Sequence, residues 1–200
     1  MRIYLARHGQ STWQVAPSTD WDTGLTDLGN EQSRRLAQWL ASRPVVAEGT
    51  RLEVCSVWGS PLIRAQRTAA LVAEALHLPL VTSPHLREAA FHVASQLPHR
   101  ETPHEPFPSF EAPTEYAVFR QQARMILKEL VEHSEITGGA VLAVSHGGLI
   151  KTMLRGATGS EHVCFNLYNT AVTVLEWRRG RWHLAHINLW DHLPPELRTI

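Results

Sequence analysis

The stretch IYLARHGQ, residues 3–10, is an apolar run typical of a buried strand, and it breaks off at Arg7, His8 and Gly9. The stretch AVLAVSHGG, residues 140–148, has the same form and ends on a histidine followed by two glycines. In an open parallel sheet, ligands bind in the crevice beyond the carboxyl ends of the strands. We therefore expect both histidines to lie at such a crevice.

Strand-like and helix-like segments alternate between these two stretches. Apolar runs rich in β-forming residues occur at residues 54–58 and 80–82. Helical spacing of apolar residues begins after Thr26 and after Ser60, two hydroxyl residues that favour helix N-caps, and the first helix is expected to end near Pro44. Such alternation is typical of βαβ units. It predicts an α/β fold with a doubly wound, mostly parallel sheet flanked by helices.

The second half of the chain adds a proline-rich stretch and a hairpin. Residues 98–113 contain five prolines and no periodic apolar pattern. Because helical spacing resumes at Thr114, we interpret this stretch as an excursion or lid and not as a linker between domains. Residues 171–177 and 182–187 are expected to form a C-terminal hairpin that turns at residues 179–180.

Length and composition exclude several classes of protein. Two hundred residues suit a single domain, residues 1–200, and 44% hydrophobic with 19% charged residues exclude a disordered or membrane-spanning chain. Nineteen basic residues balance nineteen acidic ones, so no global positive field attracts nucleic acid or anionic lipid. The N-terminal residues lack the apolar run of a secretion signal, so we expect a cytoplasmic protein. Cys55 and Cys164 are expected to be buried thiols, not disulfide or zinc ligands.

Two further features at the strand ends favour an anionic ligand. Arg64 lies in the first turn of the helix that follows residues 54–58, where its guanidinium could reach the crevice with donors suited to phosphate. Arg67 is expected on a solvated helix face. The glycines Gly147 and Gly148 would leave free backbone amides at a helix N-terminus, which attract an anion.

Taken together, these clusters resemble the motifs of the histidine phosphatase superfamily, the phosphoglycerate mutase-like group. The matching residues occur in the family's order over most of the chain: Leu5 to Ser11, Leu25 to Gly29 with Gln32, Ser60 to Leu62 with Arg64, Ala65 and Thr68, Leu86 with Glu88, and Ser145 to Gly148. The resemblance implies a doubly wound α/β fold and phosphoryl transfer through a phosphohistidine.

The resemblance also implies the central roles in that reaction. His8 matches the nucleophile, while Arg7, Arg64 and His146 match the groups that clamp the phosphoryl oxygens. A neutral imidazole is a good nucleophile near pH 7, and repulsion from two arginines and a second imidazole is expected to keep the His8 ring uncharged. The same cations neutralise the phosphoryl oxygens, so we expect neither a metal nor another cofactor.

Four more residues are assigned by the resemblance. Glu88 matches the acid that protonates the leaving group in the mutase and small-phosphatase branch, and the His146-Gly147-Gly148 sequence excludes an acid directly after the second histidine. Ser11 matches a position usually occupied by Thr that lines the phosphate pocket. Gln14 stands where the family generally has Asn. With Gly147, these two residues complete the expected phosphate-binding set.

The closest alternative is a phosphoglycerate mutase. A mutase must protect its phosphohistidine from water and needs a long cover with several cations for a second acidic group. Cofactor-dependent mutases carry a Tyr-Gly and Asn-Lys pattern soon after their acid, whereas this chain has only the short proline-rich stretch ending at Pro113. We therefore favour a phosphatase.

A metal-binding role for the twelve histidines is less favoured. His183 and His186 lie three apart in a predicted strand, so they face opposite sides unless a bulge intervenes. His92, His99 and His104 fall on or near the expected lid, where they either give the substrate mouth a pH-dependent charge or are solvated loop residues.

A non-catalytic scaffold is also less favoured, because the nucleophile, both arginines and the second histidine are present. Trp13, Trp21 and Trp39 are expected in the core or in a pocket wall rather than on an interaction surface. The expected partner is a small phosphorylated metabolite, without nucleic acid or membrane. The C-terminal hairpin packs either on its own sheet or on a second copy of the chain, which leaves a homodimer open.

Overall fold

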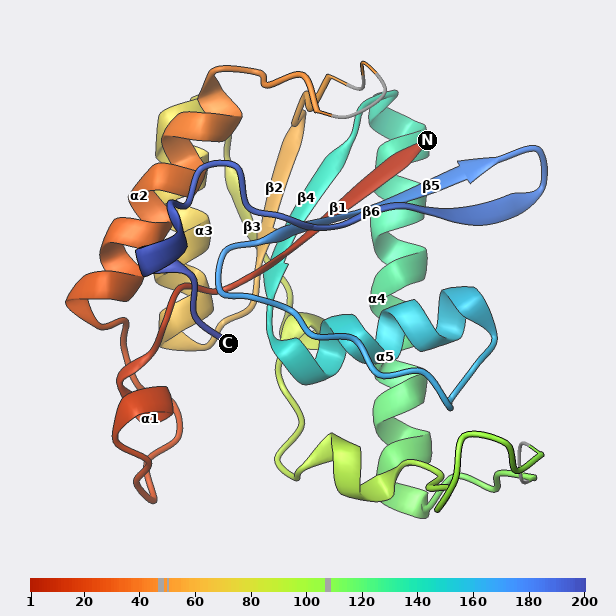
Figure 1. The fold of residues 1–200 in the computed structure, drawn as a ribbon. Coiled ribbons are helices and arrows are strands. Elements are labelled where there is room, and N and C mark those ends of the chain that lie inside the picture. The colour runs from red at the N-terminus through yellow and green to blue at the C-terminus, as the bar shows by residue number, and fades with distance from the viewer. Residues whose placement is uncertain (47–48, 50, 107–108) are drawn as a thin grey trace.

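A six-stranded sheet runs through the centre of the computed structural model, which describes residues 1–46, 49, 51–106 and 109–200 (Figure 1). The strands lie in the order β3-β2-β4-β1-β5-β6. Their bounds are β1 Arg2–Arg7, β2 Ser56–Gly59, β3 Leu80–Thr82, β4 Val141–Ser145, β5 Val172–Arg178 and β6 Arg181–Leu189. The first four strands of this order run parallel, and β5 pairs antiparallel with both of its neighbours, β1 and β6. The predicted α/β class with a mostly parallel sheet is confirmed.

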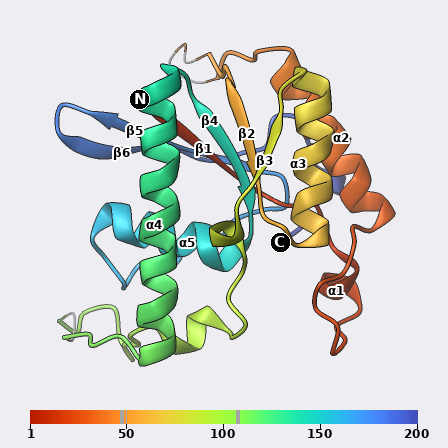
Figure 2. The same ribbon diagram turned by 180° about the vertical axis from the view of Figure 1, so that it is seen from behind.

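Helices cover both faces of the sheet. Helices α2 (Asp27–Ala41) and α3 (Ile63–Leu76) lie on one face, and α4 (Thr114–Thr137) and α5 (Gly147–Thr158) lie on the other (Figure 2). Alternate residues of β1 therefore enter two separate cores, Tyr4 toward α2 and α3, and Leu5 toward α4 and α5. Shorter elements are α1 (Thr12–Val15) and the 3₁₀ turns Pro84–Leu86, Val93–Gln96 and Pro195–Leu197.

The pairing of β1 with β4 brings the two histidine-bearing strand ends together. These strands are parallel neighbours, with Arg7 opposite Ser145. The backbone N–H of His8 donates to the carbonyl oxygen of Ser145 at 2.9 Å, which extends the ladder by one residue past the strand. His8 and His146 are therefore fixed side by side at the carboxyl edge of the sheet, as the sequence predicts.

The predicted starts of the first two long helices differ in accuracy. Thr26 is the N-cap of α2, and its side chain accepts a hydrogen bond from the backbone N–H of Gly29. Ser60, in contrast, does not cap α3, because the helix begins two residues later than predicted, with Leu62 at the N-cap. The Ser60 hydroxyl instead accepts from the N–H of Leu62 and contacts the His146 ring, so it closes the turn after β2.

The C-terminal hairpin forms as predicted. Arg179 and Gly180 connect β5 to β6, and both have positive φ, 52° and 74°, as a two-residue hairpin turn requires. The hairpin projects past the other strands at one end (Figure 1). The rings of Trp177 and Trp182 pair near its tip, with centroids 5.2 Å apart.

The exposure of the two cysteines and of Arg67, and the character of the helices, bear on three of the predictions. Cys55 and Cys164 are exposed, so the prediction of buried thiols is wrong; both lie in connecting segments and not in a helix or strand. Within the described part of the chain, none of the helices has the length and apolar character that crossing a membrane requires. Arg67 is exposed on α3, as predicted.

Candidate active site

His8 directly follows β1 and presents one ring nitrogen for chemistry. Its Nδ1 lies 2.7 Å from the carbonyl oxygen of Gly9, which can only accept, so Nδ1 carries the proton. In the neutral ring, Nε2 then holds a lone pair, and the Nε–H of Arg64 donates to it at 3.2 Å. The side-chain amide of Asn169 donates to the backbone carbonyl of His8 at 2.8 Å. Both the tautomer and the position of the ring are therefore fixed.

The His8 ring is neutral near pH 7 because it is buried. Its side chain is 5% exposed, and burial lowers the pKa of His8 well below its usual value. The charges of Arg7 and Arg64 lower the pKa further. The sequence analysis predicts a neutral His8 ring from repulsion by nearby positive charges. In the structure, burial is the larger cause of the lowered pKa.

His146 lies behind His8 and is fully buried. The two ring centroids are 5.1 Å apart. Its Nε2 lies 2.8 Å from the hydroxyl oxygen of Ser60, while its Nδ1 has no hydrogen-bond partner among the described residues. Burial, followed by the neighbouring His8 and the two arginines, lowers the pKa of His146 well below its usual value. This nitrogen is an unsatisfied polar atom next to the nucleophile candidate.

The two predicted arginines converge on His8 from different elements. Arg7, the last residue of β1, donates from Nη1 to the carbonyl oxygen of Leu167 at 2.7 Å, and its buried Nε has no partner among the described residues. Arg64, in the first turn of α3, donates from Nη1 to the carbonyl oxygen of Trp21 at 2.8 Å. Asp22 Oδ1 also lies 3.9 Å from Arg64 Nη1, a long ion pair with a part-exposed carboxylate. Both guanidinium groups thus face His8 and are suited to bind the oxygens of an anionic ligand.

Glu88 is held against the N-terminus of α5. Its Oε2 accepts from the backbone N–H of Gly148 at 2.8 Å, and its Oε1 accepts from Leu149 at 3.0 Å and Ala89 at 3.1 Å. The amides of Gly148 and Leu149 are thus occupied, so the expectation of a free amide for an anionic ligand is wrong at Gly148. A Cβ on Gly148 would lie 2.4 Å from Glu88 Oε1, so a larger residue at position 148 would collide with the carboxylate.

The ionisation of Glu88 reflects opposing influences. Burial raises the pKa of the Glu88 carboxyl, while the amide hydrogen bonds and the charges of Arg64 and Arg7 act in the opposite direction. The net shift is upward. A buried carboxyl with a raised pKa is suited to donate a proton near neutral pH.

The loop that carries His8 is packed against the start of α2. A Cβ on Gly9 would lie 2.3 Å from the carbonyl oxygen of Gly29, so the two backbones touch and leave no room for a side chain. The N–H of Gly9 donates to the buried hydroxyl of Thr68 at 3.1 Å. These contacts explain why glycines occur in both matching motifs.

Ser11 and Gln14 lie in the same loop and are held by a network that the sequence did not predict. The Gln14 side-chain oxygen accepts from the Ser11 backbone at 3.0 Å, and its Nε2 donates to Asn169 Oδ1 at 3.1 Å. Thr199 also donates to Asn169 Oδ1, and Gln32 donates to Thr199. Asn169 is fully buried and lies 161 residues from His8, so no local motif identifies it.

A cavity of about 680 Å³, which we call the catalytic cavity, opens beside His8. Seven of the eight predicted site residues line it: Arg7, His8, Ser11, Gln14, Arg64, Glu88 and Gly147. His146 does not line it, because it lies one layer deeper. The wall includes Trp13 and Trp21, in agreement with one of the two expectations for these side chains.

The proline-rich stretch does not line the catalytic cavity in the part that the structure describes. Residues 89–94 line it, and His92 is among them, whereas His99 and His104 are exposed elsewhere. Residues 107–108 of the expected lid lie outside the described residues. Of His92, His99 and His104, only His92 is therefore placed to give the mouth of the cavity a pH-dependent charge.

The histidines of the described residues do not form a metal site. In that part of the chain, no group of three or more His, Cys, Asp or Glu side chains lies close enough to hold a metal ion. A bulge does occur in the pairing of β5 with β6 near His186, yet it does not bring such a group together.

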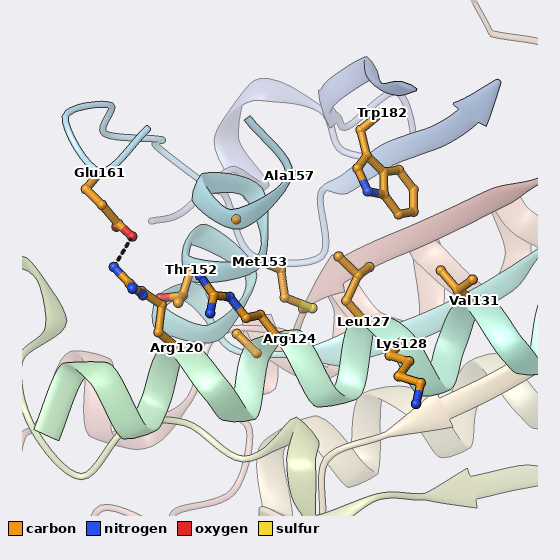
Figure 3. A pocket seen from close by; sticks show the side chains of 12 residues that line it. Arg120, Arg124, Leu127, Lys128, Val131, Thr152, Met153, Ala157, Glu161 and Trp182 are labelled. Atoms are coloured by element: carbon orange, nitrogen blue, oxygen red, sulfur yellow. Dashed lines mark hydrogen bonds and ion pairs between the residues drawn. The ribbon is translucent and has the colours of Figure 1, made fainter. Parts of the chain in front are cut away.

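A second, smaller cavity of about 260 Å³, which we call the α4–α5 groove, lies between these helices and Trp182 of β6 (Figure 3). Three basic residues of α4, Arg120, Arg124 and Lys128, line it together with apolar side chains. Arg120 is paired with Glu161 at 3.1 Å, and Lys128 is paired with Glu132 at 3.5 Å.

Comparison with known proteins gives both a family and a fold. The family model of the histidine phosphatase superfamily (branch 1) matches residues 3–189. An uncharacterized phosphatase of Bacillus subtilis, PhoE, is 25% identical over 201 residues and 96% of each chain. A 2,3-bisphosphoglycerate-dependent phosphoglycerate mutase of a Methylobacterium species is 43% identical over 79 residues, 38% of this chain and 35% of the mutase.

Solved structures share the fold over nearly the whole chain. A phosphoserine phosphatase of Entamoeba histolytica in complex with phosphoserine has a TM-score of 0.72 and 22% identity, and covers 96% of this chain and 99% of its own. A mycobacterial glucosyl-3-phosphoglycerate phosphatase has a TM-score of 0.71 and 23% identity, and covers 94% of this chain and 98% of its own.

Proposed function

Since the chain belongs to the histidine phosphatase superfamily, a family of phosphatases and mutases, we propose that it is a phosphatase for small phosphomonoesters that works through a phosphohistidine on His8 and without a metal. One observation carries the proposal. The Nε2 lone pair of His8 faces Arg64, while Arg7 Nε and His146 Nδ1 are buried at the same site and have no hydrogen-bond partner in the described part of the chain. A phosphoryl group at His8 would give each of these groups an oxygen to bind.

In the first step, His8 Nε2 attacks the phosphorus atom of the ester. The N–P bond forms as the P–O bond to the alcohol breaks, and the carboxyl proton of Glu88 passes to the departing oxygen. The guanidinium groups of Arg7 and Arg64 bind the phosphoryl oxygens during the transfer. A neutral alcohol leaves, with the phosphoryl group on His8 and Glu88 ionised.

In the second step, water attacks the phosphohistidine. Glu88 takes a proton from the water, the new P–O bond forms and the N–P bond breaks. Inorganic phosphate leaves, and both His8 and Glu88 return to their starting protonation states. The same carboxyl thus acts as acid and then as base, as its shifted pKa favours.

The second histidine acts through its hydrogen bond to Ser60. The Ser60 hydroxyl accepts from the N–H of Leu62, so its own proton is available to His146 Nε2. The neutral His146 ring then carries its proton on Nδ1, the buried nitrogen without a partner. We assign this Nδ1–H as a donor to one phosphoryl oxygen.

The partial similarity to phosphoglycerate mutases makes intramolecular phosphoryl transfer the second candidate. A single assay separates the two. Purified protein is incubated with a panel of phosphomonoesters that includes 3-phosphoglycerate, with and without excess EDTA, and both inorganic phosphate and 2-phosphoglycerate are measured. We expect phosphate release that EDTA does not reduce. Isomer formation without phosphate release would establish a mutase, and loss of activity in EDTA would reject the metal-free mechanism.

A further inference from the structure

Two cations beyond the phosphate clamp line the catalytic cavity. Lys151 and Arg155 lie four residues apart on α5, so their side chains leave the same face of the helix. They lie one and two turns beyond Gly147, about 6 and 12 Å along the helix axis. Neither side chain belongs to the clamp that surrounds His8.

Arg155 is a buried cation without a carboxylate partner. Its side chain is 3% exposed, and its Nε donates to the carbonyl oxygen of Val163 at 3.2 Å. Its Nη1 is buried and has no hydrogen-bond partner among the described residues. The nearby Tyr116 donates to Glu161, so that carboxylate is shared with Tyr116 and Arg120. An unpaired buried guanidinium nitrogen is costly unless a ligand satisfies it.

Lys151 is half-buried and makes no ion pair with any described residue. Burial lowers the pKa of its ammonium group, Arg7 and Arg155 lower it further, and Glu88 acts in the opposite direction. Lys151 thus lines the cavity close to two other cations and without an ion-pair partner of its own. Such a position is unfavourable in the empty cavity and becomes favourable when an anion enters.

The cations of the cavity differ in whether a carboxylate lies near them. Four cationic side chains line it, Arg7, Arg64, Lys151 and Arg155, against one carboxylate side chain, Glu88. The carboxylates lie near the clamp, because Glu88 acts on both Arg7 and Arg64, and Asp22 lies 3.9 Å from Arg64 Nη1. Lys151 and Arg155 have no ion-pair partner among the described residues, so these two cations are available to a second anionic group of the substrate.

We propose that Lys151 and Arg155 form a subsite for a substrate carboxylate, so that the preferred substrate is a short acid whose phosphoryl group and carboxylate lie a few bonds apart. This inference rests on the proposed phosphatase function, because it concerns the same cavity. The arginine supplies a fork of donors that fits a carboxylate, and the lysine adds a mobile charge between that fork and the phosphate clamp.

Matched pairs of esters test the subsite. 3-Phosphoglycerate and glycerol 3-phosphate differ in one end group, a carboxylate or a hydroxymethyl, and phosphoserine and phosphoethanolamine differ by a carboxylate. For the natural chain we expect a higher kcat/KM for the acid of each pair. In Lys151→Met this preference is expected to fall roughly ten- to hundredfold, as loss of a charge-assisted contact predicts. Arg155→Met is expected to have a similar effect.

The control is Lys128→Met, which removes an exposed lysine of α4 and is expected to leave the preference unchanged. Thermal unfolding verifies that each variant is folded. An unchanged preference in folded Lys151→Met would overturn the subsite. Lys151→Met could instead keep its preference for the acids and lose a preference for fructose 1,6-bisphosphate over fructose 6-phosphate. That result would overturn the carboxylate assignment and show that the subsite binds a second phosphate.

Equilibrium binding separates failure of the subsite from failure of the proposed function. If the natural chain hydrolyses none of these esters, the phosphatase proposal fails, and calorimetric titration of 3-phosphoglycerate and glycerol 3-phosphate still decides the subsite. Tighter binding of the acid that depends on Lys151 supports it. Equal binding of the two esters overturns it.

Discussion

The catalytic cavity and the α4–α5 groove are both lined by basic side chains at helical spacing, yet they differ in how those charges are satisfied. In the groove, Arg120 is paired with Glu161 (Figure 3), and Lys128 is paired with Glu132. In the cavity, Lys151 and Arg155 have no carboxylate partner among the described residues. Buried nitrogens without a hydrogen-bond partner there occur in both places, Arg120 Nε in the groove and Arg7 Nε and Arg155 Nη1 in the cavity, so the contrast lies in the carboxylate partners. Paired cations near solvent contribute little energy, whereas unpaired buried ones are retained at a cost.

This difference identifies which cavity is built for a ligand. Spacing alone does not, because Arg120 and Arg124 on α4 repeat the four-residue spacing of Lys151 and Arg155 on α5. Only the structure shows that Arg120 and Lys128 of α4 have acidic neighbours, whereas Lys151 and Arg155 of α5 line the cavity that His8 also lines. Substitutions in and around the catalytic cavity and the α4–α5 groove test this contrast, and their expected effects range from complete loss of activity to almost none.

Removing the nucleophile should abolish the activity of the catalytic cavity. His8→Ala is expected to lower phosphate release from any ester by at least about 10⁴-fold, since no other group can replace a covalent nucleophile. The control is His99→Ala, an exposed histidine that does not line the cavity, which should retain full activity. Near-normal turnover in His8→Ala would exclude His8 as the nucleophile.

Removing the acid should affect esters according to their leaving groups. Glu88→Gln is expected to lower kcat for alkyl phosphates by about 10²–10⁴-fold, because an alkoxide needs a proton to depart. For p-nitrophenyl phosphate, whose leaving group departs without a proton, a loss below about tenfold is expected. Initial rates on both esters provide the comparison. Equal losses on the two would assign the proton to another donor.

His192 Nδ1 is also buried without a hydrogen-bond partner among the residues that the structure describes, and His192 does not line the catalytic cavity. Burial lowers the pKa of His192 to about 3. The unfolded chain therefore binds a proton there below its usual pKa of 6.5 while the folded chain does not, so stability falls as the pH decreases from about 6.5 toward 3. At pH 5 this difference lowers the free energy of unfolding by about 2 kcal/mol relative to pH 7.

Urea unfolding at pH 7 and pH 5 tests this role of His192. The loss of unfolding free energy between the two pH values should be smaller in His192→Gln by about 2 kcal/mol. Activity at pH 7 should remain, since this side chain acts on stability and not on a ligand. An unchanged pH dependence in the variant would show that His192 is protonated in the folded chain.

A small change at the start of α5 should disturb Glu88 selectively. In Gly148→Ala the new methyl group would lie 2.4 Å from Glu88 Oε1, so the carboxyl must move away from the amides that hold it. We expect about a tenfold loss on alkyl phosphates and little loss on p-nitrophenyl phosphate. Gly156→Ala on the same helix, where no atom lies within 4 Å of the added Cβ, is the matched control. Identical kinetics for both variants would refute the positioning of Glu88 by α5.

The smallest effect is expected in the α4–α5 groove. Arg124→Met should change kcat and KM for phosphomonoesters by less than about twofold, because a surface charge away from the reacting groups contributes little. Steady-state kinetics on the same esters provide the measurement. A large rise in KM would show that the groove takes part in substrate binding and would remove the contrast between the two cavities.

The sequence predicts the parts of the site that follow from strand ends. Apolar runs that stop at His8 and His146 require only the period of a strand and the common edge of a parallel sheet, and the structure places the two rings 5.1 Å apart. Arg64 follows from its position in the first turn of the next helix. The family motifs add Glu88, which the structure places in the cavity.

Other parts depend on contacts between distant segments. Asn169 supports the His8 backbone from 161 residues away, and no spacing rule identifies it. Glu88 accepts a hydrogen bond from the Gly148 amide, and His146 contacts the Ser60 hydroxyl. Both contacts depend on how distant segments pack, which local sequence propensity does not predict. Lys151 could have been found, because it lies four residues after Gly147 on the predicted helix and therefore on the same face.

The most direct test of the account is to trap the phosphorylated enzyme. Rapid acid-free quenching of the protein during turnover of a ³²P-labelled ester, followed by peptide mapping, shows which residue holds the phosphoryl group. The account predicts a label on His8 that is stable in base, labile in acid and absent from His8→Ala. Turnover without any such label, or with the label on another residue, would contradict it.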